Sequence, residues 1–385
     1  MNMRSGKKLV IFVAGFLFSL SMAFTTYINS SFLTEYVDRL TLGIIYTAAS
    51  LVSILIMFRM PRLLNRFGAR RFSLYASILA SGTFFILALT PHKALAIGAF
   101  IANTVAINFL IASLDIFVED FSKNHNIGRF RGLYLSIINI AWVLSQVLSG
   151  SIITKSSFSG IYMLSALFMI LTTFIFSFFL HEFKDPKYIQ TPVLRIIRNF
   201  IKNHDIGRIY LLNFILKFFF AWMGIYTPLY LNQVIGFGWD KIGLIFAIML
   251  TPFVFLSYPL GRLSDKYGEK SFLIFGFLCA SITVFMIPQI KAPLFIYWAG
   301  ILFLSRIGAA TIEVMTESYF FKVESEENAD AISFFRNTHP LSYLIAPILA
   351  SAVLFFTPGF QYIFIALTIV MLIGLYISLR LRDIK

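Results

Sequence analysis

Three ionisable residues lie inside long apolar stretches of the sequence. Lys217 precedes three phenylalanines, Arg306 precedes small residues, and Glu313 follows Arg306 by seven positions. A charge in an apolar surrounding is costly, so such residues line a solvent-filled cavity, pair with one another or bind a solute. Two cations favour a solute with negative charge. The alternative is that Lys217 extends to the edge of the apolar layer and Arg306 pairs with an acid such as Glu313.

Polar residues in the first half of the chain are further candidates for the wall of such a cavity. Their amide, hydroxyl and indole groups would bind a solute by hydrogen bonding. Hydrogen bonds between packed helices are the commoner use of these residue types and stay open as the alternative. The candidates are Tyr27, Asn108, Asn139, Trp142 and Gln146.

Two acids near the ends of apolar stretches are each followed by an arginine. Glu119 precedes Arg131, and Glu317 precedes Arg336 at a similar place in the second half. We interpret both as structural ion pairs in preference to groups that take part in coupling.

The sequence carries no pattern typical of catalysis or metal binding. Cys279 is the one cysteine, which excludes a disulfide framework, and the five histidines are scattered without HxxxH or HExxH spacing. Neither a phosphate-binding loop nor a GxSxG motif is present. We therefore expect no enzyme activity, no metal and no cofactor.

The composition indicates the environment of these residues. Of the 385 residues, 58% are hydrophobic and 13% are charged, whereas soluble domains carry about 25% charged residues. A membrane span needs about 20 apolar residues, and helices satisfy their own backbone groups in lipid. We expect an all-α integral membrane protein, and we treat its first apolar stretch as a retained helix. The twelve predicted spans are residues 8–28, 41–60, 72–90, 94–117, 131–153, 159–181, 209–231, 241–260, 271–289, 294–318, 332–356 and 360–380.

The distribution of basic residues predicts the orientation. With twelve spans, 24 of the 32 Lys and Arg residues fall on the side of the two termini and five fall on the other side. Because basic connections stay inside, both termini are expected in the cytoplasm of a multi-pass plasma-membrane protein, or an inner-membrane protein in a Gram-negative cell. The net charge of +14 therefore requires no nucleic-acid partner.

The longest connection divides the chain. Residues 182–208 contain two prolines, and residues 193–202 have the amphipathic, basic pattern of a helix on the membrane surface. We interpret residues 1–181 and 209–385 as two six-helix halves joined by a cytoplasmic linker.

The two halves repeat one another. Residues 61–72 read PRLLNRFGARRF and residues 261–272 read GRLSDKYGEKSF, so that Arg62, Gly68 and Phe72 recur at an offset of 200. Parallel halves of this kind predict a solute site between them near the middle of the bilayer.

The second copy resembles the cytoplasmic loop signature of the major facilitator superfamily, G-x-L-x-D-r-x-G-r-k, at Gly261, Arg262, Asp265, Gly268 and Lys270. The resemblance implies two pseudo-symmetric six-helix halves and a conformational latch at Asp265. Physically, Gly268 permits a tight turn, and Asp265 is suited to a helix N-terminus or to a cation such as Arg131. The first copy departs from the signature, because Pro61 replaces its first glycine and Asn65 replaces its acidic residue.

Together these features predict a secondary active transporter that moves a small solute by alternating access. The solute is expected to be anionic or amphiphilic, with membrane lipids and a coupling ion, H⁺ or Na⁺, as further partners. Two alternatives stay open: a non-transporting sensor or assembly protein on the same scaffold, and a lipid or drug exporter.

Overall fold

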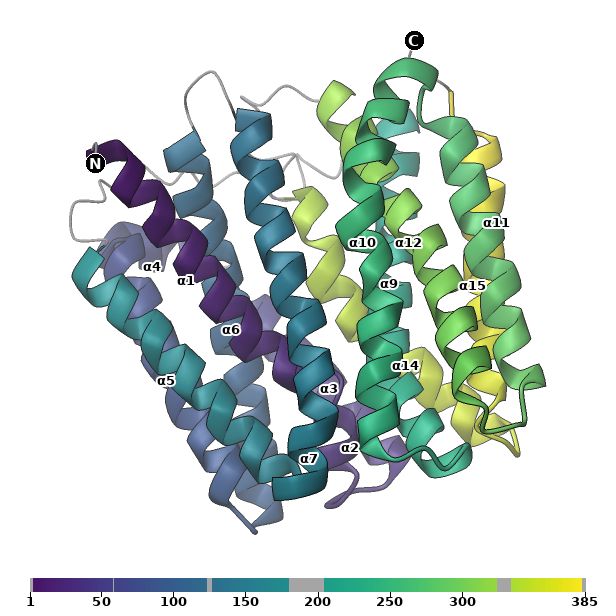
Figure 1. Ribbon diagram of the computed structural model, residues 1–385, viewed down its shortest axis with the longest axis horizontal. Coiled ribbons are helices and arrows are strands. Elements are labelled where there is room, and N and C mark those ends of the chain that lie inside the picture. The colour runs from purple at the N-terminus through teal and green to yellow at the C-terminus, as the bar shows by residue number, and fades with distance from the viewer. Residues whose placement is uncertain (1–2, 58, 123–126, 180–203, 324–333, 383–385) are drawn as a thin grey trace. The chain divides into compact units, whose positions relative to one another are not determined.

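The computed structural model describes residues 3–57, 59–122, 127–179, 204–323 and 334–382, and no β-strand occurs among them. Long helices account for nearly all of this part of the chain (Figure 1). This is the all-α architecture that the apolar stretches predict, because a helix satisfies every backbone donor and acceptor without water.

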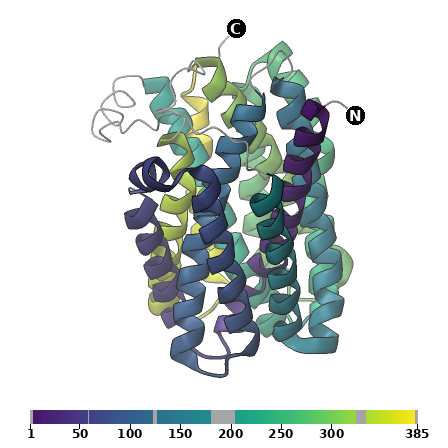
Figure 2. The same cartoon turned by 90° about the vertical axis from the view of Figure 1, so that its left-hand side faces the viewer.

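The structure describes seven helices before residue 180. Helices α5 and α6 lie side by side and are joined by three residues, 90–92 (Figure 2). The helices are α1 (Met3–Thr26), α2 (Asn29–Leu33), α3 (Arg39–Met57), α4 (Met60–Phe67), α5 (Ala69–Leu89), α6 (Lys93–Ser122) and α7 (Ile127–Phe179).

Helix α7 holds two of the predicted spans. Its backbone leaves helical geometry at Ser156 and at Ser157, where φ is 58°. A run of 53 residues is too long for one crossing, since about 20 residues span the hydrocarbon layer. The break therefore separates the predicted spans 131–153 and 159–181.

The described helices after residue 203 follow the same pattern, and a π-helical turn and a 3₁₀ turn occur among them. They are α9 (His204–Leu229), η1 (Tyr230–Val234), α10 (Trp239–Tyr267), α11 (Lys270–Met286), η2 (Ile287–Gln289), α12 (Phe295–Val323), α14 (Thr338–Phe356) and α15 (Tyr362–Leu379). In the described residues 11 helices are long and apolar enough to cross a membrane. With the break in α7, they account for all twelve predicted spans.

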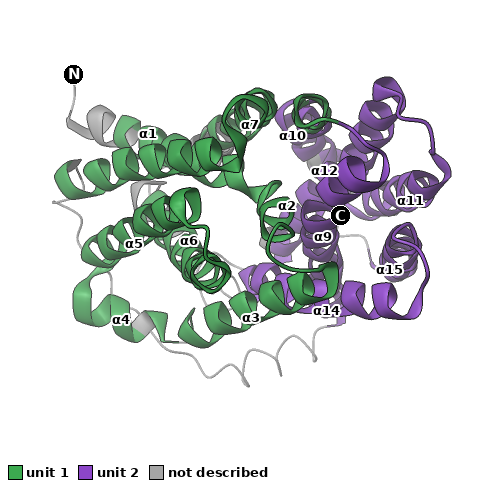
Figure 3. Cartoon of the chain, turned by 90° about the horizontal axis from the view of Figure 1, so that it is seen from below, with its two compact units in different colours: residues 1–189, 238–247 green, residues 190–237, 248–385 purple. Residues whose placement is uncertain are grey.

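The chain forms two compact units (Figure 3). Unit 1 contains residues 1–189 and 238–247, and unit 2 contains residues 190–237 and 248–385. The first turns of α10 thus belong to unit 1. The predicted linker, residues 182–208, lies mostly outside the described residues, so its surface helix stays a prediction.

Unit 1 is held together by α1 packing on both parts of α7. The rings of Phe24 and Phe168 stack with their centroids 5.9 Å apart, and Ser21 donates a hydrogen bond to the Ser165 carbonyl at 2.7 Å. A Cβ on Gly150 of α7 would overlap the Trp239 carbonyl oxygen at the start of α10. Glycine thus permits two backbones to touch, which is how helices pack closely in lipid.

Unit 2 uses the same device between α11 and α12. A Cβ on Gly308 would lie 2.7 Å from the Gly276 carbonyl oxygen, and a Cβ on Gly276 would lie 3.0 Å from the Gly308 carbonyl oxygen. Small residues at this crossing bring α12 close to α11. The close contact helps to fix the position of α12 and of the charged residues on it.

Candidate functional site

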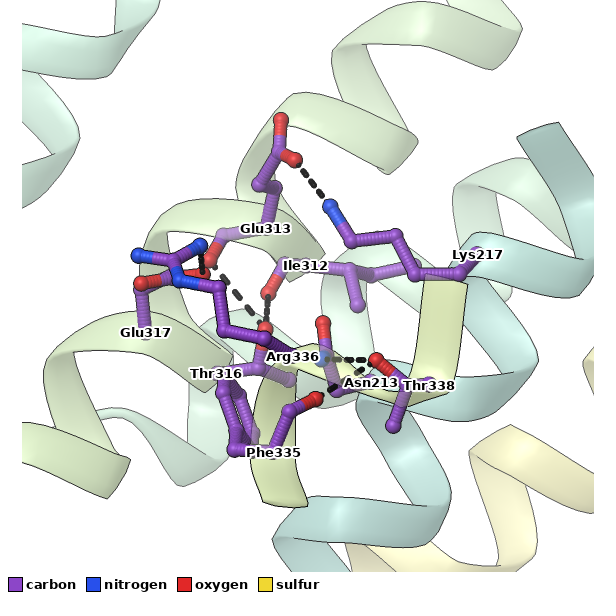
Figure 4. A network of polar contacts seen from close by, with 9 residues as sticks. All are labelled: Asn213, Lys217, Ile312, Glu313, Thr316, Glu317, Phe335, Arg336 and Thr338. Carbon is purple, nitrogen blue, oxygen red and sulfur yellow. Dashed lines mark hydrogen bonds and ion pairs between the residues drawn. The ribbon is translucent and has the colours of Figure 1, made fainter. Parts of the chain in front are cut away.

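The central feature of unit 2 is an ion pair between two membrane-spanning helices. Lys217 Nζ of α9 lies 2.6 Å from Glu313 Oε1 of α12 (Figure 4). The side chains are 16% and 32% exposed, so the pair is only partly removed from solvent. The sequence placed Glu313 on the helix face of Arg306 and left their pairing open. The structure instead shows Glu313 paired with Lys217, 96 positions away in the sequence.

Arg306 lies beside this pair in an aromatic surrounding. Its side chain is 2% exposed, and its guanidinium carbon is 5.0 Å from the Phe219 ring centroid and 5.3 Å from that of Phe220. Lys217 Nζ is also 5.3 Å from the Phe220 centroid. Phe220 therefore contacts both cations, and the electron-rich faces of the rings compensate part of the cost of burying them.

A layer of hydrogen bonds next to the ion pair joins α9 to α14. Asn213 Nδ2 donates to Thr338 Oγ1 at 2.9 Å, and Thr338 Oγ1 donates to the Phe335 carbonyl at 2.8 Å (Figure 4). Asn213 and Lys217 are four residues apart on α9, so they share one helix face. The layer fixes the face of α9 from which Lys217 projects toward α12.

Glu317 and Arg336, which we expected to pair, approach within 3.5 Å. Their side chains are 28% and 39% exposed, so the stabilisation from this contact is small. The second expected pair, Glu119 with Arg131, lies outside the described side chains.

The polar candidates of unit 1 differ in their burial and in their contacts. Gln146 is 1% exposed and donates from Nε2 to the Ala23 carbonyl at 2.8 Å, which is the helix-packing alternative. Tyr27 and Trp142 form an edge-to-face ring pair with centroids 6.3 Å apart. Asn108 and Asn139 are half-buried.

The repeated connections carry the glycine turns that the sequence indicated. Gly68 and Gly268 have positive φ values of 77° and 80°, where a Cβ would be strained. Lys270 is the first residue of α11. Arg262 stacks on Tyr258, 5.2 Å from its ring centroid, and a Cβ on Gly261 would meet nothing within 4 Å. The side chain of Asp265 is outside the described part, so the latch stays a prediction.

A buried acid that the sequence analysis did not single out lies beside this connection. Glu269 is 0% exposed, and its Oε1 is 2.6 Å from Lys322 Nζ and accepts a hydrogen bond from Ser264 Oγ at 2.8 Å. Ser318 Oγ also donates to it, at 3.2 Å. A buried carboxylate needs such partners. The sequence contained one indication that this acid is unusual: Glu269 occupies a position where the loop signature has a basic residue.

The described residues contain no group of three or more His, Cys, Asp and Glu side chains that could hold a metal ion. Around Phe220 the described groups are two cations, Lys217 and Arg306, and Lys217 is paired with the Glu313 carboxylate.

Comparison with known proteins places these features in a family. The family model described as Major Facilitator Superfamily matches residues 11–249 and 239–385. A bacterial homolog of the human lysosomal transporter Spinster, solved inward-facing and unoccupied, superposes with a TM-score of 0.77 at 12% identity, over 97% of this chain and 96% of that chain. A mutant of the nucleoside transporter NupG gives a TM-score of 0.73 at 14% identity, over 97% and 99%. No curated protein sequence matches the chain.

Proposed function

Because the chain belongs to the major facilitator superfamily, we propose that this multi-pass membrane protein is a secondary active transporter of a small solute by alternating access. The repeat of six-helix halves supports the proposal, since such scaffolds expose a site near the midplane to each side in turn. The excess of basic residues on one side supports a plasma-membrane location with both termini in the cytoplasm.

The solute that we propose is an anion with an apolar or aromatic part. The observation that carries this is that Lys217 and Arg306 both lie over the Phe220 ring, with Glu313 paired to Lys217. These three side chains together have one net positive charge, and the rings of Phe219 and Phe220 supply an apolar surface beside it. A carboxylate or phosphate on the solute would add the missing negative charge.

Glu313 is the group that we propose for coupling. A proton or a sodium ion on its carboxylate would compete with Lys217 for the same oxygen atoms. Releasing Lys217 in this way would leave it available to the anionic solute. Ion binding and solute binding would then favour one another, as coupled transport requires.

The test is ligand-dependent stability together with exchange in liposomes. A panel of anionic, neutral, cationic and lipid-like solutes is added to detergent-purified wild type, Arg306→Gln and Arg336→Gln. A solute at about 100 times its Kd should stabilise the protein by about 2.7 kcal/mol. We expect anions to do so in wild type and in Arg336→Gln, which removes a cation from the more exposed pair, and to fail in Arg306→Gln.

Two outcomes would contradict the proposal. If cationic or neutral solutes alone stabilise the wild type, the anionic assignment is wrong. If anions stabilise the protein but wild-type liposomes exchange none of them, the non-transporting sensor is the better hypothesis.

A further inference from the structure

The first copy of the repeated connection is far more basic than the second. Residues 59–71 contain five arginines, and no acidic residue occurs between Asp38 and Asp115. The corresponding residues of the second copy include Asp265 and Glu269 beside their basic neighbours. A connection on the cytoplasmic side is expected to be rich in basic residues. This expectation does not explain why the first copy lacks acidic residues at the positions of Asp265 and Glu269.

Helix α4 presents these arginines on one face. Arg59, Arg62 and Arg66 are spaced by three and four residues, so they align along the helix, and all three are exposed. Met60 and Leu64, on the opposite side, are 7% and 4% exposed. The apolar side of α4 is thus used for packing within unit 1, and the basic side is turned away from it.

One of the five arginines is already occupied. Arg70 donates hydrogen bonds to the carbonyls of Phe176 and Ser177 in the last turn of α7, which ties α5 to the end of α7. No acidic side chain among the described residues forms an ion pair with Arg59, Arg62, Arg66 or Arg71. Four guanidinium groups are therefore left for an external partner.

Aromatic side chains lie beside this face. Phe67 is 36% exposed and Tyr75 is 56% exposed, and their rings meet edge to face with centroids 6.2 Å apart. The Arg66 guanidinium is 5.3 Å from the Phe67 centroid. Exposed aromatic rings next to basic residues at the end of a span are typical of the level of lipid headgroups.

We propose that α4 and the start of α5 bind an anionic glycerophospholipid, with its phosphodiester between the arginines and its upper acyl chains against Phe67 and Tyr75. Clustered arginines next to a span attract such lipids, and each basic residue near the surface contributes about fivefold in affinity. Arginine also holds a phosphate through two parallel N–H donors, which a topology signal alone does not need.

The repeat supplies a matched control for the experiment. R62Q/R66Q removes two charges from α4, and R262Q/K266Q removes two charges from the equivalent positions of the second copy. Detergent-purified full-length protein is titrated with phosphatidylglycerol or phosphatidylcholine in mixed micelles. Bound lipid is counted by native mass spectrometry, and the Tm is followed in parallel.

We expect wild type and R262Q/K266Q to bind phosphatidylglycerol with similar affinity, and R62Q/R66Q to bind it about 25-fold more weakly. R62K/R66K, which keeps the charges, should regain most of the affinity, and R59Q/R71Q gives a second test outside the body of α4. Soluble glycerol phosphate should not replace the lipid.

Three results would overturn the proposal. Wild type could bind phosphatidylcholine as tightly as phosphatidylglycerol. The two charge-removal variants could lose affinity equally, which would mean that the attraction is spread over the whole basic side. Glycerol phosphate could compete at the concentration of the lipid, which would mean that the acyl chains make no contact with α4.

Discussion

The described interiors of the two units satisfy their polar groups in different ways. In unit 1, Asn103 donates to Thr83 Oγ1 at 2.9 Å and Gln146 donates to the Ala23 carbonyl at 2.8 Å, and all four groups are neutral. Unit 2 also has a neutral hydrogen bond, from Asn213 to Thr338, but Lys217, Arg306 and Glu313 lie in its interior as well.

Neutral hydrogen bonds and charged groups inside a membrane protein have different uses. Neutral hydrogen bonds between helices contribute modestly to packing in lipid, and they leave no charge for a solute or an ion to meet. Charged groups inside a span are expensive and are retained where they have a function. If the proposed solute site is correct, the solute meets the charged groups of unit 2, and the described hydrogen bonds of unit 1 serve helix packing.

The largest expected effect comes from breaking the ion pair of unit 2. Lys217→Met or Glu313→Gln should reduce transport at least tenfold and lower the free energy of unfolding by about 1–3 kcal/mol, since one charge is left without its partner and both side chains are partly exposed. The double variant should regain most of the stability but none of the transport. Liposome uptake and thermal unfolding are measured for the wild type, the two single variants and the double variant, which together form a double-mutant cycle. Full transport by the double variant would show that the pair is structural only.

An intermediate effect is expected where unit 1 depends on close packing. Gly150→Ala places a methyl group against the Trp239 carbonyl oxygen and 2.9 Å from Asp240 Cα, and overpacking of this kind costs about 1–3 kcal/mol. Gly98→Ala is the matched control, because a Cβ there meets nothing within 4 Å. We expect a lower Tm for the first variant and an equal or higher Tm for the second. Equal Tm values would mean that α7 and α10 tolerate separation at this point.

The smallest effect is expected at the neutral hydrogen bonds. Gln146→Leu removes the donor to the Ala23 carbonyl and should lower the free energy of unfolding by about 1 kcal/mol. Solute affinity, measured by the ligand-induced shift in Tm, should stay at the wild-type value. A loss of affinity as large as that expected for Arg306→Gln would assign Gln146 to the solute site and remove the contrast between the units.

The spans were predictable because hydropathy is a local property. Each predicted stretch is long and apolar enough by itself to require a helix in lipid, so all twelve were found without knowledge of the packing. The turn at Gly268 was predictable from its place between two apolar stretches, since glycine adopts a positive φ without the strain that other residues have there.

The partners of the charges were not predictable, because they depend on which helices pack together. Helical spacing related Glu313 to Arg306 on one helix, whereas its ion-pair partner, Lys217, is on α9. Glu269 illustrates the same limit: nothing local shows that its carboxylate is fully buried against Lys322 at the end of α12. The first pair depends on the packing of α9 on α12, and the second on the close packing of α11 on α12 at Gly276 and Gly308.

The two-residue break in α7 also bears on how the protein is made. Helices enter a membrane in the order of their synthesis, with the N-terminal elements first. Because only Ser156 and Ser157 leave helical geometry between the two spans, neither span can move far from the other after both have left the ribosome. In the folded protein the two spans therefore form one helical hairpin with a two-residue turn. Helix α1 is synthesised long before them, and it obtains its contacts with Ser165 and Phe168 only when the second arm of that hairpin arrives.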